Sequence, residues 1–164
     1  MNEVQIGFST RKYNPLAALI RLMTKSKVSH TWLLYMDKTF GIQMVLEATV
    51  EGVRISPYDK FNKKNQIIAI IDPRYSIEKG LISIKERLGD KYNFMGLFGM
   101  FFVIVGRWFK RKVKNPLHDP NALYCSELVT EVLQNSDYPG SEQLGIETTS
   151  PKQLYDFLSK VKII

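Results

Sequence analysis

Residues 121–133 read NALYCSELVTEVL and contain Cys125, the single cysteine of this 164-residue chain. After Cys125, the apolar residues recur at the spacing of one helix face, at Leu128, Val129, Val132 and Leu133. The pattern predicts a helix that begins near Cys125 and places the thiol in its first turn, on the face that packs inward.

The start of this helix gives the thiol a distinctive setting. Pro116 and Pro120 interrupt any element before it, and Asp119 or Asn121 is expected to cap it. The first turn of a helix presents free backbone N–H groups and the positive end of the helix dipole, which both favour a thiolate. A buried cysteine on an apolar helix face also fits an inert packing role, and residue type alone leaves both interpretations open.

Composition limits the class of protein. Hydrophobic residues make up 45% of the chain and charged residues 24%, as in a folded globular domain. One cysteine cannot form an internal disulfide, and the first residues, MNEVQIGF, do not form a signal peptide, so we expect a cytoplasmic protein. The net charge of +7 suits an anionic partner and does not distinguish among nucleic acid, acidic lipid and a phosphorylated substrate.

Hydrophobic periodicity predicts an α+β fold with a largely antiparallel sheet packed against helices. Strands are expected at residues 4–9, 29–36, 43–50 and 66–71, with residues 52–57 extending the third strand past a bulge. Helices are expected from Asn14-Pro15 onward, over residues 77–88, from Cys125 and from Ser150-Pro151 to Leu158.

Two of these strands bring a histidine and a carboxylate together. If the turn between them is centred at residues 39–40, paired positions have numbers that sum to about 79, so His30 faces Thr49 and Trp32 faces Glu47. Side chains alternate along a strand, so His30 and Glu47 lie diagonally on one face. Glu47 could then accept the imidazole N–H, while the other ring nitrogen takes a proton from a thiol. A one-residue slip of register would separate the two side chains.

Each of these residues also has an ordinary structural interpretation. An isolated histidine such as His30 is commonly structural, and a glutamate that alternates with apolar residues, such as Glu47, commonly faces water. His118, the other histidine, lies in the proline-rich loop seven residues before Cys125. It is either solvent-exposed or close to the thiol.

Four short stretches occur together in a characteristic order. These are Ser29-His30-Thr31-Trp32, Val45-Leu46-Glu47-Ala48, Tyr124-Cys125-Ser126-Glu127-Leu128-Val129 and Ser150-Pro151-Lys152-Gln153-Leu154. The order resembles that of the circularly permuted branch of the NlpC/P60 papain-like superfamily, which includes YiiX-type proteins and lecithin:retinol acyltransferase-like enzymes. The resemblance spans nearly all of residues 1–164 and is most specific at the cysteine stretch. It implies a single permuted papain-like domain.

The resemblance also implies a mechanism. Cys125 would be the nucleophile, His30 the general base and acid, and Glu47 the residue that orients the imidazole. The bond cleaved would be an amide, ester or thioester. The substrate would be a small molecule, a peptide or a lipid-like acyl compound, such as a lipid-linked or peptidoglycan-type molecule. The reaction would use no cofactor and no metal. The backbone N–H of Cys125 would stabilise the oxyanion, with Tyr13 and Tyr124 as candidates for a second donor. Glu47 stands where the acyltransferases commonly have a second histidine, which weakens any inference to retinoid chemistry.

The region around residues 93–114 is expected to be an apolar and basic insertion. Residues 95–105 read MGLFGMFFVIV and are followed, after Gly106, by RWFKRK at residues 107–112, and this run is too short to cross a bilayer. It fits a buried core helix. Its three phenylalanines, two glycines and basic flank favour instead a segment that makes peripheral contact with an anionic membrane or covers an acyl chain.

Two rival functions remain at this point. A non-catalytic module of the same fold would bind lipid or peptide without turnover. A nucleic-acid partner is supported by net charge alone, because the sequence has no recognition-helix or stacking pattern. The wide spacing of the two histidines and one cysteine argues against a zinc site.

Overall fold

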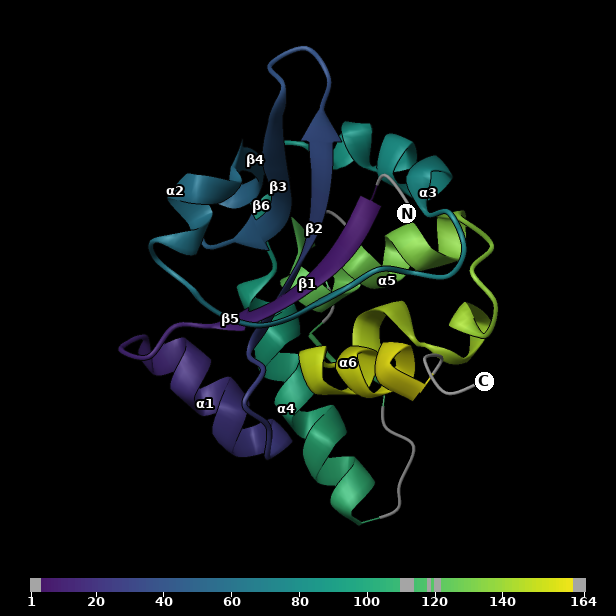
Figure 1. The fold of residues 1–164 in the computed structure, drawn as a ribbon. Helices are drawn as coiled ribbons and strands as arrows, with labels where there is room; N and C mark the ends of the chain where they lie inside the picture. The colour runs from purple at the N-terminus through teal and green to yellow at the C-terminus, as the bar shows by residue number, and fades with distance from the viewer. Residues whose placement is uncertain (1–3, 110–113, 118, 120–121, 161–164) are drawn as a thin grey trace.

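The protein is described by a computed structural model that covers residues 4–109, 114–117, 119 and 122–160. Five strands form its main sheet: β1 (Val4–Thr10), β2 (His30–Asp37), β3 (Ile42–Thr49), β4 (Gly52–Pro57) and β5 (Gln66–Ile71). Their order is β4-β3-β2-β1-β5, and every neighbouring pair is antiparallel, so the predicted α+β class with an antiparallel sheet is confirmed (Figure 1).

The register of the β2–β3 hairpin is the predicted one. Leu33 pairs with Leu46 and Leu34 with Val45, so the paired numbers sum to 79. Asp37 stabilises the turn that sets this register, because its Oδ1 accepts the backbone N–H groups of the two residues at the turn centre at 2.9 Å.

The prediction for residues 52–57 was wrong. These residues do not extend β3 but form the separate antiparallel strand β4, which returns after a turn at residues 50–51. Gly52 has a φ of +103°, a left-handed conformation that a residue with a side chain rarely adopts. The glycine therefore allows the chain to reverse where the sequence pattern suggested a bulge.

Helices cover both faces of the sheet. On one face, α5 (Cys125–Asn135) packs with α3 (Glu78–Ser83) and α6 (Pro151–Lys160), and on the other lies the short α2 (Tyr58–Asn62). Helices α1 (Pro15–Thr24) and α4 (Phe94–Trp108) lie side by side next to the sheet (Figure 1). The smaller elements are η1 (Ile84–Arg87), η2 (Ser141–Gln143), η3 (Ile146–Thr148), and the parallel pair β6 (Lys91–Tyr92) and β7 (Ala122–Leu123).

Three hydrophobic clusters hold these layers together. The largest joins the inner side of α5 to residues of β1, β2 and β3, and includes Phe8, Leu33 and Leu128. On the opposite face Trp32 packs against Phe61 of α2, with ring centroids 4.7 Å apart. Because both faces of β2 are covered by packed side chains, the position of its first residue, His30, is fixed by the strand.

The apolar run around residues 95–105 forms most of α4, and neither interpretation of it is complete. One side of α4 is buried with Ile20 and Tyr124, through Leu97, Met100, Val103 and Ile104. The opposite side carries large hydrophobic side chains that remain exposed. In the part of the chain that the structure describes, no helix has both the length and the hydropathy to span a bilayer.

Candidate active site

His30 begins β2, where it pairs with Ser9 of β1. Its Nε2 lies 2.8 Å from Oε2 of Glu47, the diagonal neighbour predicted from the hairpin register. A carboxylate can only accept, so Nε2–H is the donor and the other ring nitrogen is left for a second partner. That partner is Cys125, whose side chain lies close enough to the imidazole to raise its pKa. The three side chains expected from the sequence therefore come together.

Glu47 is held from its other side by an arginine. The carboxylate is buried, with 1% of its side chain exposed, and its Oε1 accepts from Nε and Nη2 of Arg54 at 3.1 and 3.0 Å. Arg54 stands directly opposite Glu47 in β4 and also pairs with the exposed Glu51. Burial alone would raise the pKa of Glu47, but the hydrogen bonds and charges of His30 and Arg54 outweigh it and lower that pKa. The carboxylate is thus kept ionised.

The same contacts set the charge of the imidazole. Burial alone would lower the pKa of His30, whereas the hydrogen bonds and electrostatic attraction of Cys125 and Glu47 raise it to about 9. At neutral pH this environment favours the imidazolium. An imidazolium beside a thiol group favours the thiolate, which is the nucleophilic form of cysteine.

Cys125 is the first residue of α5, as predicted, but the helix is capped differently from the prediction. Tyr124 is the residue before the helix, in an extended conformation, and its backbone N–H donates to Oε2 of Glu127 at 2.9 Å. Asp119 is too far upstream to cap this helix, and Asn121 lies outside the described residues. The N–H groups of the first turn, including that of Cys125, have no acceptor within the helix itself.

Glu127 was quoted in the sequence motif without a role. It is fully buried and interacts with Asn93 as well as with the backbone of Tyr124. Burial raises its pKa to about 8, despite these hydrogen bonds. Its spacing of three residues from Tyr124 is the usual signal of a glutamate that returns to the start of its own helix.

Sequence reasoning also missed Tyr92. In the parallel pair of β6 and β7, Tyr92 lies opposite Leu123, two residues before Cys125. Burial, together with the nearby Cys125 and Glu127, raises the pKa of its hydroxyl well above the ordinary value, so the hydroxyl keeps its proton. No local sequence pattern could place this tyrosine, because β6 and β7 are separated by the whole of α4.

Other candidates from the sequence are not in the site. Tyr13 is 98% exposed, and the hydroxyl of Tyr124 donates to the backbone oxygen of Glu147 at 2.8 Å. Neither is placed to act as a second oxyanion donor, so this expectation was wrong for both. His118 lies outside the described residues.

A small pocket opens beside these side chains. It has a volume of about 90 Å³ and is lined by His30 and Glu47, with Arg11, Ile20, Asn65 and Tyr92 among its other walls. Cys125 is only 1% exposed and is not among the lining residues. A substrate in the pocket therefore meets the imidazole first, and must displace side chains or part of the α1 wall to reach the sulfur.

The described residues do not offer a metal centre. Among them, no group of three or more His, Cys, Asp or Glu side chains is arranged to hold a metal ion. The side chains of Cys125, His30 and Glu47 are engaged with one another and with Arg54.

Comparison with known proteins adds a likeness of fold. The sequence matches no protein-family model, and no curated protein is significantly similar to it. Among solved structures, the chain is similar to that of the metalloprotein YiiX from Escherichia coli O157:H7. The TM-score is 0.59 at 23% sequence identity, and the match covers 82% of this chain and 66% of the YiiX chain. The chain thus has a YiiX-like fold, an antiparallel sheet packed against helices.

Proposed function

We propose that the protein is a cysteine-dependent hydrolase or acyltransferase that acts on an amide, ester or thioester. The observation that carries the proposal is the imidazole of His30, held between the carboxylate of Glu47 and the thiol of Cys125 at the start of α5. The order histidine, glutamate, cysteine along the chain corresponds to a permuted papain-like site.

In the first half-reaction, His30 as the imidazolium holds the proton that Cys125 has given up, and the sulfur attacks the carbonyl carbon of the substrate as a thiolate. The carbonyl oxygen becomes an oxyanion, which the free backbone N–H of Cys125 stabilises. Tyr92 supplies a second donor, because its hydroxyl remains protonated and lies close to the thiol. His30 then returns its proton to the leaving amine, alcohol or thiol, and an acyl group remains on the sulfur as a thioester.

In the second half-reaction, water or another acceptor loses a proton to His30 and attacks the thioester carbon. The acyl product departs, and the sulfur leaves as the thiolate, again paired with the imidazolium of His30. Glu47 stays ionised throughout and holds the Nε2–H of His30, while Arg54 maintains the charge and position of that carboxylate.

The burial of Cys125 supports a second candidate, a module of the same fold that binds a lipid or peptide without turnover. In this alternative, the pocket beside His30 would hold the ligand and the sulfur behind it would remain unreactive. The two candidates differ in one observable, the covalent acyl adduct.

The experiment is therefore a search for that adduct by intact-protein mass spectrometry. Purified protein is mixed with activated esters and thioesters of short and long acyl chains, and with small peptide amides, and is quenched within seconds. We expect an acyl adduct on Cys125 that hydroxylamine removes, and product release in the wild type only. Cys125→Ala should show neither, while His118→Gln, a change to the other histidine, should retain both. Absence of adduct and turnover with every substrate class would leave the binding module as the function.

A further inference from the structure

One face of α4, continued by the residue after it, is largely exposed among the described residues. It carries seven large hydrophobic side chains, each between 37% and 73% exposed: Phe94, Met95, Phe98, Phe102, Val105, Trp108 and Phe109. Five of the seven, from residue 95 to residue 109, follow one another at intervals of three or four, so they form a continuous stripe along one side of the helix. An exposed apolar stripe of this length indicates a surface that binds something.

Gly96 and Gly99, the two glycines of the apolar run 95–105, are not part of this stripe. A Cβ atom at Gly96 would overlap the side chain of Asn93, and one at Gly99 would overlap that of Asn115. Asn115 donates to the backbone oxygen of Gly96 at 2.8 Å. These glycines therefore allow close packing on the inner side of the helix, and the sequence-based argument that they favour membrane contact was wrong. Within the apolar run, only the exposed aromatic and aliphatic side chains support contact with a membrane.

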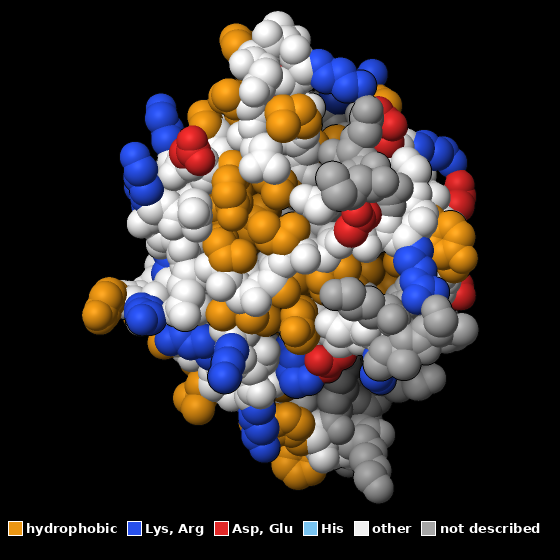
Figure 2. Space-filling view, in the orientation of Figure 1, with side chains coloured by type: hydrophobic (Ala, Val, Ile, Leu, Met, Phe, Trp, Pro, Cys, Tyr) orange, Lys and Arg blue, Asp and Glu red, His pale blue; other side chains and the backbone are white. Residues whose placement is uncertain are grey.

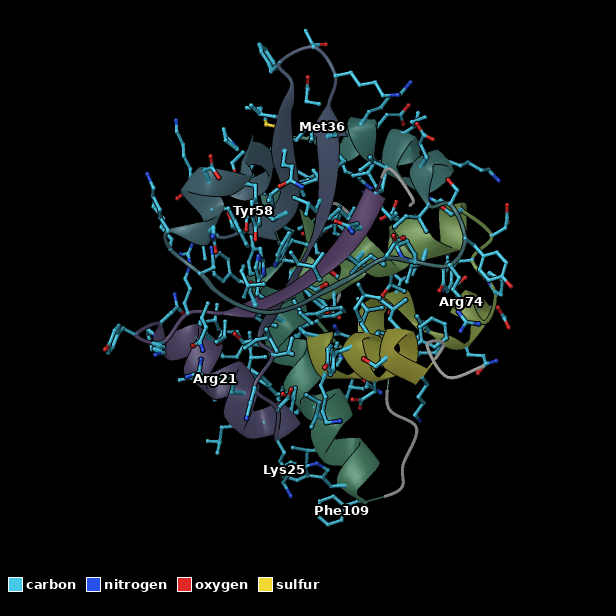
Figure 3. All side chains as sticks on the ribbon, viewed as in Figure 1. Arg21, Lys25, Met36, Tyr58, Arg74 and Phe109 are labelled. Carbon is cyan, nitrogen blue, oxygen red and sulfur yellow. The ribbon has the colours of Figure 1, made fainter. Side chains whose placement is uncertain are left out.

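The charges around the stripe are of one sign. Residues 4–36, which include α1, contain no aspartate or glutamate, and neither do residues 91–118, which include α4. Lys12, Lys25 and Lys27 are exposed on or next to α1. Nζ of Lys25 lies 5.2 Å from the ring centroid of Trp108, so basic and aromatic side chains share one end of the surface (Figure 3). Figure 2 shows hydrophobic and basic side chains side by side at this lower end of the molecule.

We propose that the outer face of α4, with the basic residues of α1 beside it, docks onto an anionic lipid bilayer. Aromatic and aliphatic side chains with a lysine rim match the chemistry of an interface between acidic headgroups and acyl chains. The 15 residues of α4 extend about 22 Å, less than the hydrocarbon core of a bilayer. The helix therefore lies in the plane of the interface, with its inner side still packed on Ile20 and Tyr124.

A second copy of the chain is a poorer occupant of this face. In a two-fold dimer the same surface meets itself, so the exposed lysines near α1 would face one another without acidic partners from residues 4–36 or 91–118. The net charge of +7 adds to this repulsion, whereas acidic lipid relieves it.

The two tryptophans of the chain provide a test. Trp32 is fully buried beneath α2, while Trp108 is 55% exposed on the stripe. The Cys125→Ala protein is mixed with vesicles of phosphatidylcholine alone, or with vesicles that also contain about 30% phosphatidylglycerol. Each kind of vesicle is prepared with and without brominated acyl chains. The variant cannot form an acyl adduct, so the result is independent of the proposed function.

We expect binding to the phosphatidylglycerol vesicles, a blue shift of Trp108 and its quenching by bromine, with loss of the quenching in Trp108→Phe. Phe102→Ser should weaken binding about tenfold. Phe40→Ser should not weaken it, because Phe40 is equally exposed but lies at the tip of the β2–β3 hairpin, at the opposite end of the molecule (Figure 1). Lys25→Ala should weaken binding about fivefold, and Lys60→Ala, on α2, should not.

Three results would overturn the proposal. One is equal binding to vesicles with and without phosphatidylglycerol, or binding to neither. Another is equal weakening by Phe102→Ser and Phe40→Ser. The third is a concentration-dependent dimer in sedimentation that shields Trp108 without lipid, which would assign the stripe to self-association.

Discussion

Replacing Glu47 with glutamine should lower the pKa of His30. Glutamine keeps the size of the side chain and an oxygen that accepts from Nε2, but removes the negative charge 2.8 Å from the ring. The pKa of His30 rises from 6.5 to about 9 in the folded protein, which corresponds to a preference of about 3 kcal/mol for the imidazolium. Because the side chain is only 19% exposed, solvent screens this preference little.

The size of the change follows from the two partners of the ring. A hydrogen bond to a charged group contributes about 1.5–3 kcal/mol, against about 1 kcal/mol for a neutral one. Loss of the charge of Glu47 should therefore lower the pKa of His30 by about 0.4–1.5 pH units, while Cys125 continues to raise it. Because the folded pKa is raised, the stabilisation is complete below pH 6.5 and is lost as the pH rises towards about 9. In Glu47→Gln this loss should occur at lower pH.

The assay is an NMR titration of protein labelled at its histidine rings. With two histidines in the chain, His118→Gln assigns the signal of His30. The matched control is Glu51→Gln, since Glu51 also pairs with Arg54 but is 68% exposed, and its loss should leave the titration of His30 nearly unchanged. A wild-type midpoint near 6.5, or equal shifts in Glu47→Gln and Glu51→Gln, would refute the reasoning.

Three further predictions concern residues around the site. Tyr92→Phe should lower kcat about ten- to a hundredfold with KM and thermal stability nearly unchanged, because it removes one oxyanion donor; unchanged steady-state kinetics would exclude that role. Glu127→Gln should flatten the fall of Tm between pH 5 and 9 by at least about 5 °C. The pKa of Glu127 is raised from 4.5 to about 8, so the acid form stabilises the fold at low pH and is lost as the pH rises; parallel Tm curves would contradict this. Gly7→Ala should destabilise the protein by about 1–3 kcal/mol in urea titration, because the added Cβ would overlap the indole ring of the buried Trp32; a free energy of unfolding equal to that of the wild type would show that the ring can move aside.

Local sequence patterns could predict the hairpin and the helix start, and these determine most of the site. A short turn fixes the register of β2 and β3, so the diagonal placement of His30 and Glu47 follows from counting. The spacing of apolar residues after Cys125 places the thiol at the start of α5. Both inferences depend only on residues that are close in the sequence.

The missing parts of the site depend on contacts that a local pattern does not encode. Arg54 was missed because residues 52–57 were interpreted as a continuation of β3, whereas a return strand places it opposite Glu47. The turn signal was present in Gly52, whose positive φ makes the reversal possible. Tyr92 was missed because its position next to the thiol depends on β6 pairing with β7, across the whole length of α4.

The most direct test of the central claim is the pH dependence of alkylation of Cys125. The rate of alkylation by iodoacetamide is measured at pH 6.0 and at pH 8.5. The burial of Cys125 slows the reaction equally at the two pH values, so it does not affect the ratio of the two rates. If the thiol shares its proton with His30, the wild-type rates should agree within about threefold, while those of His30→Ala should differ more than about a hundredfold, as for an ordinary thiol. A wild-type ratio equal to that of His30→Ala would contradict the account.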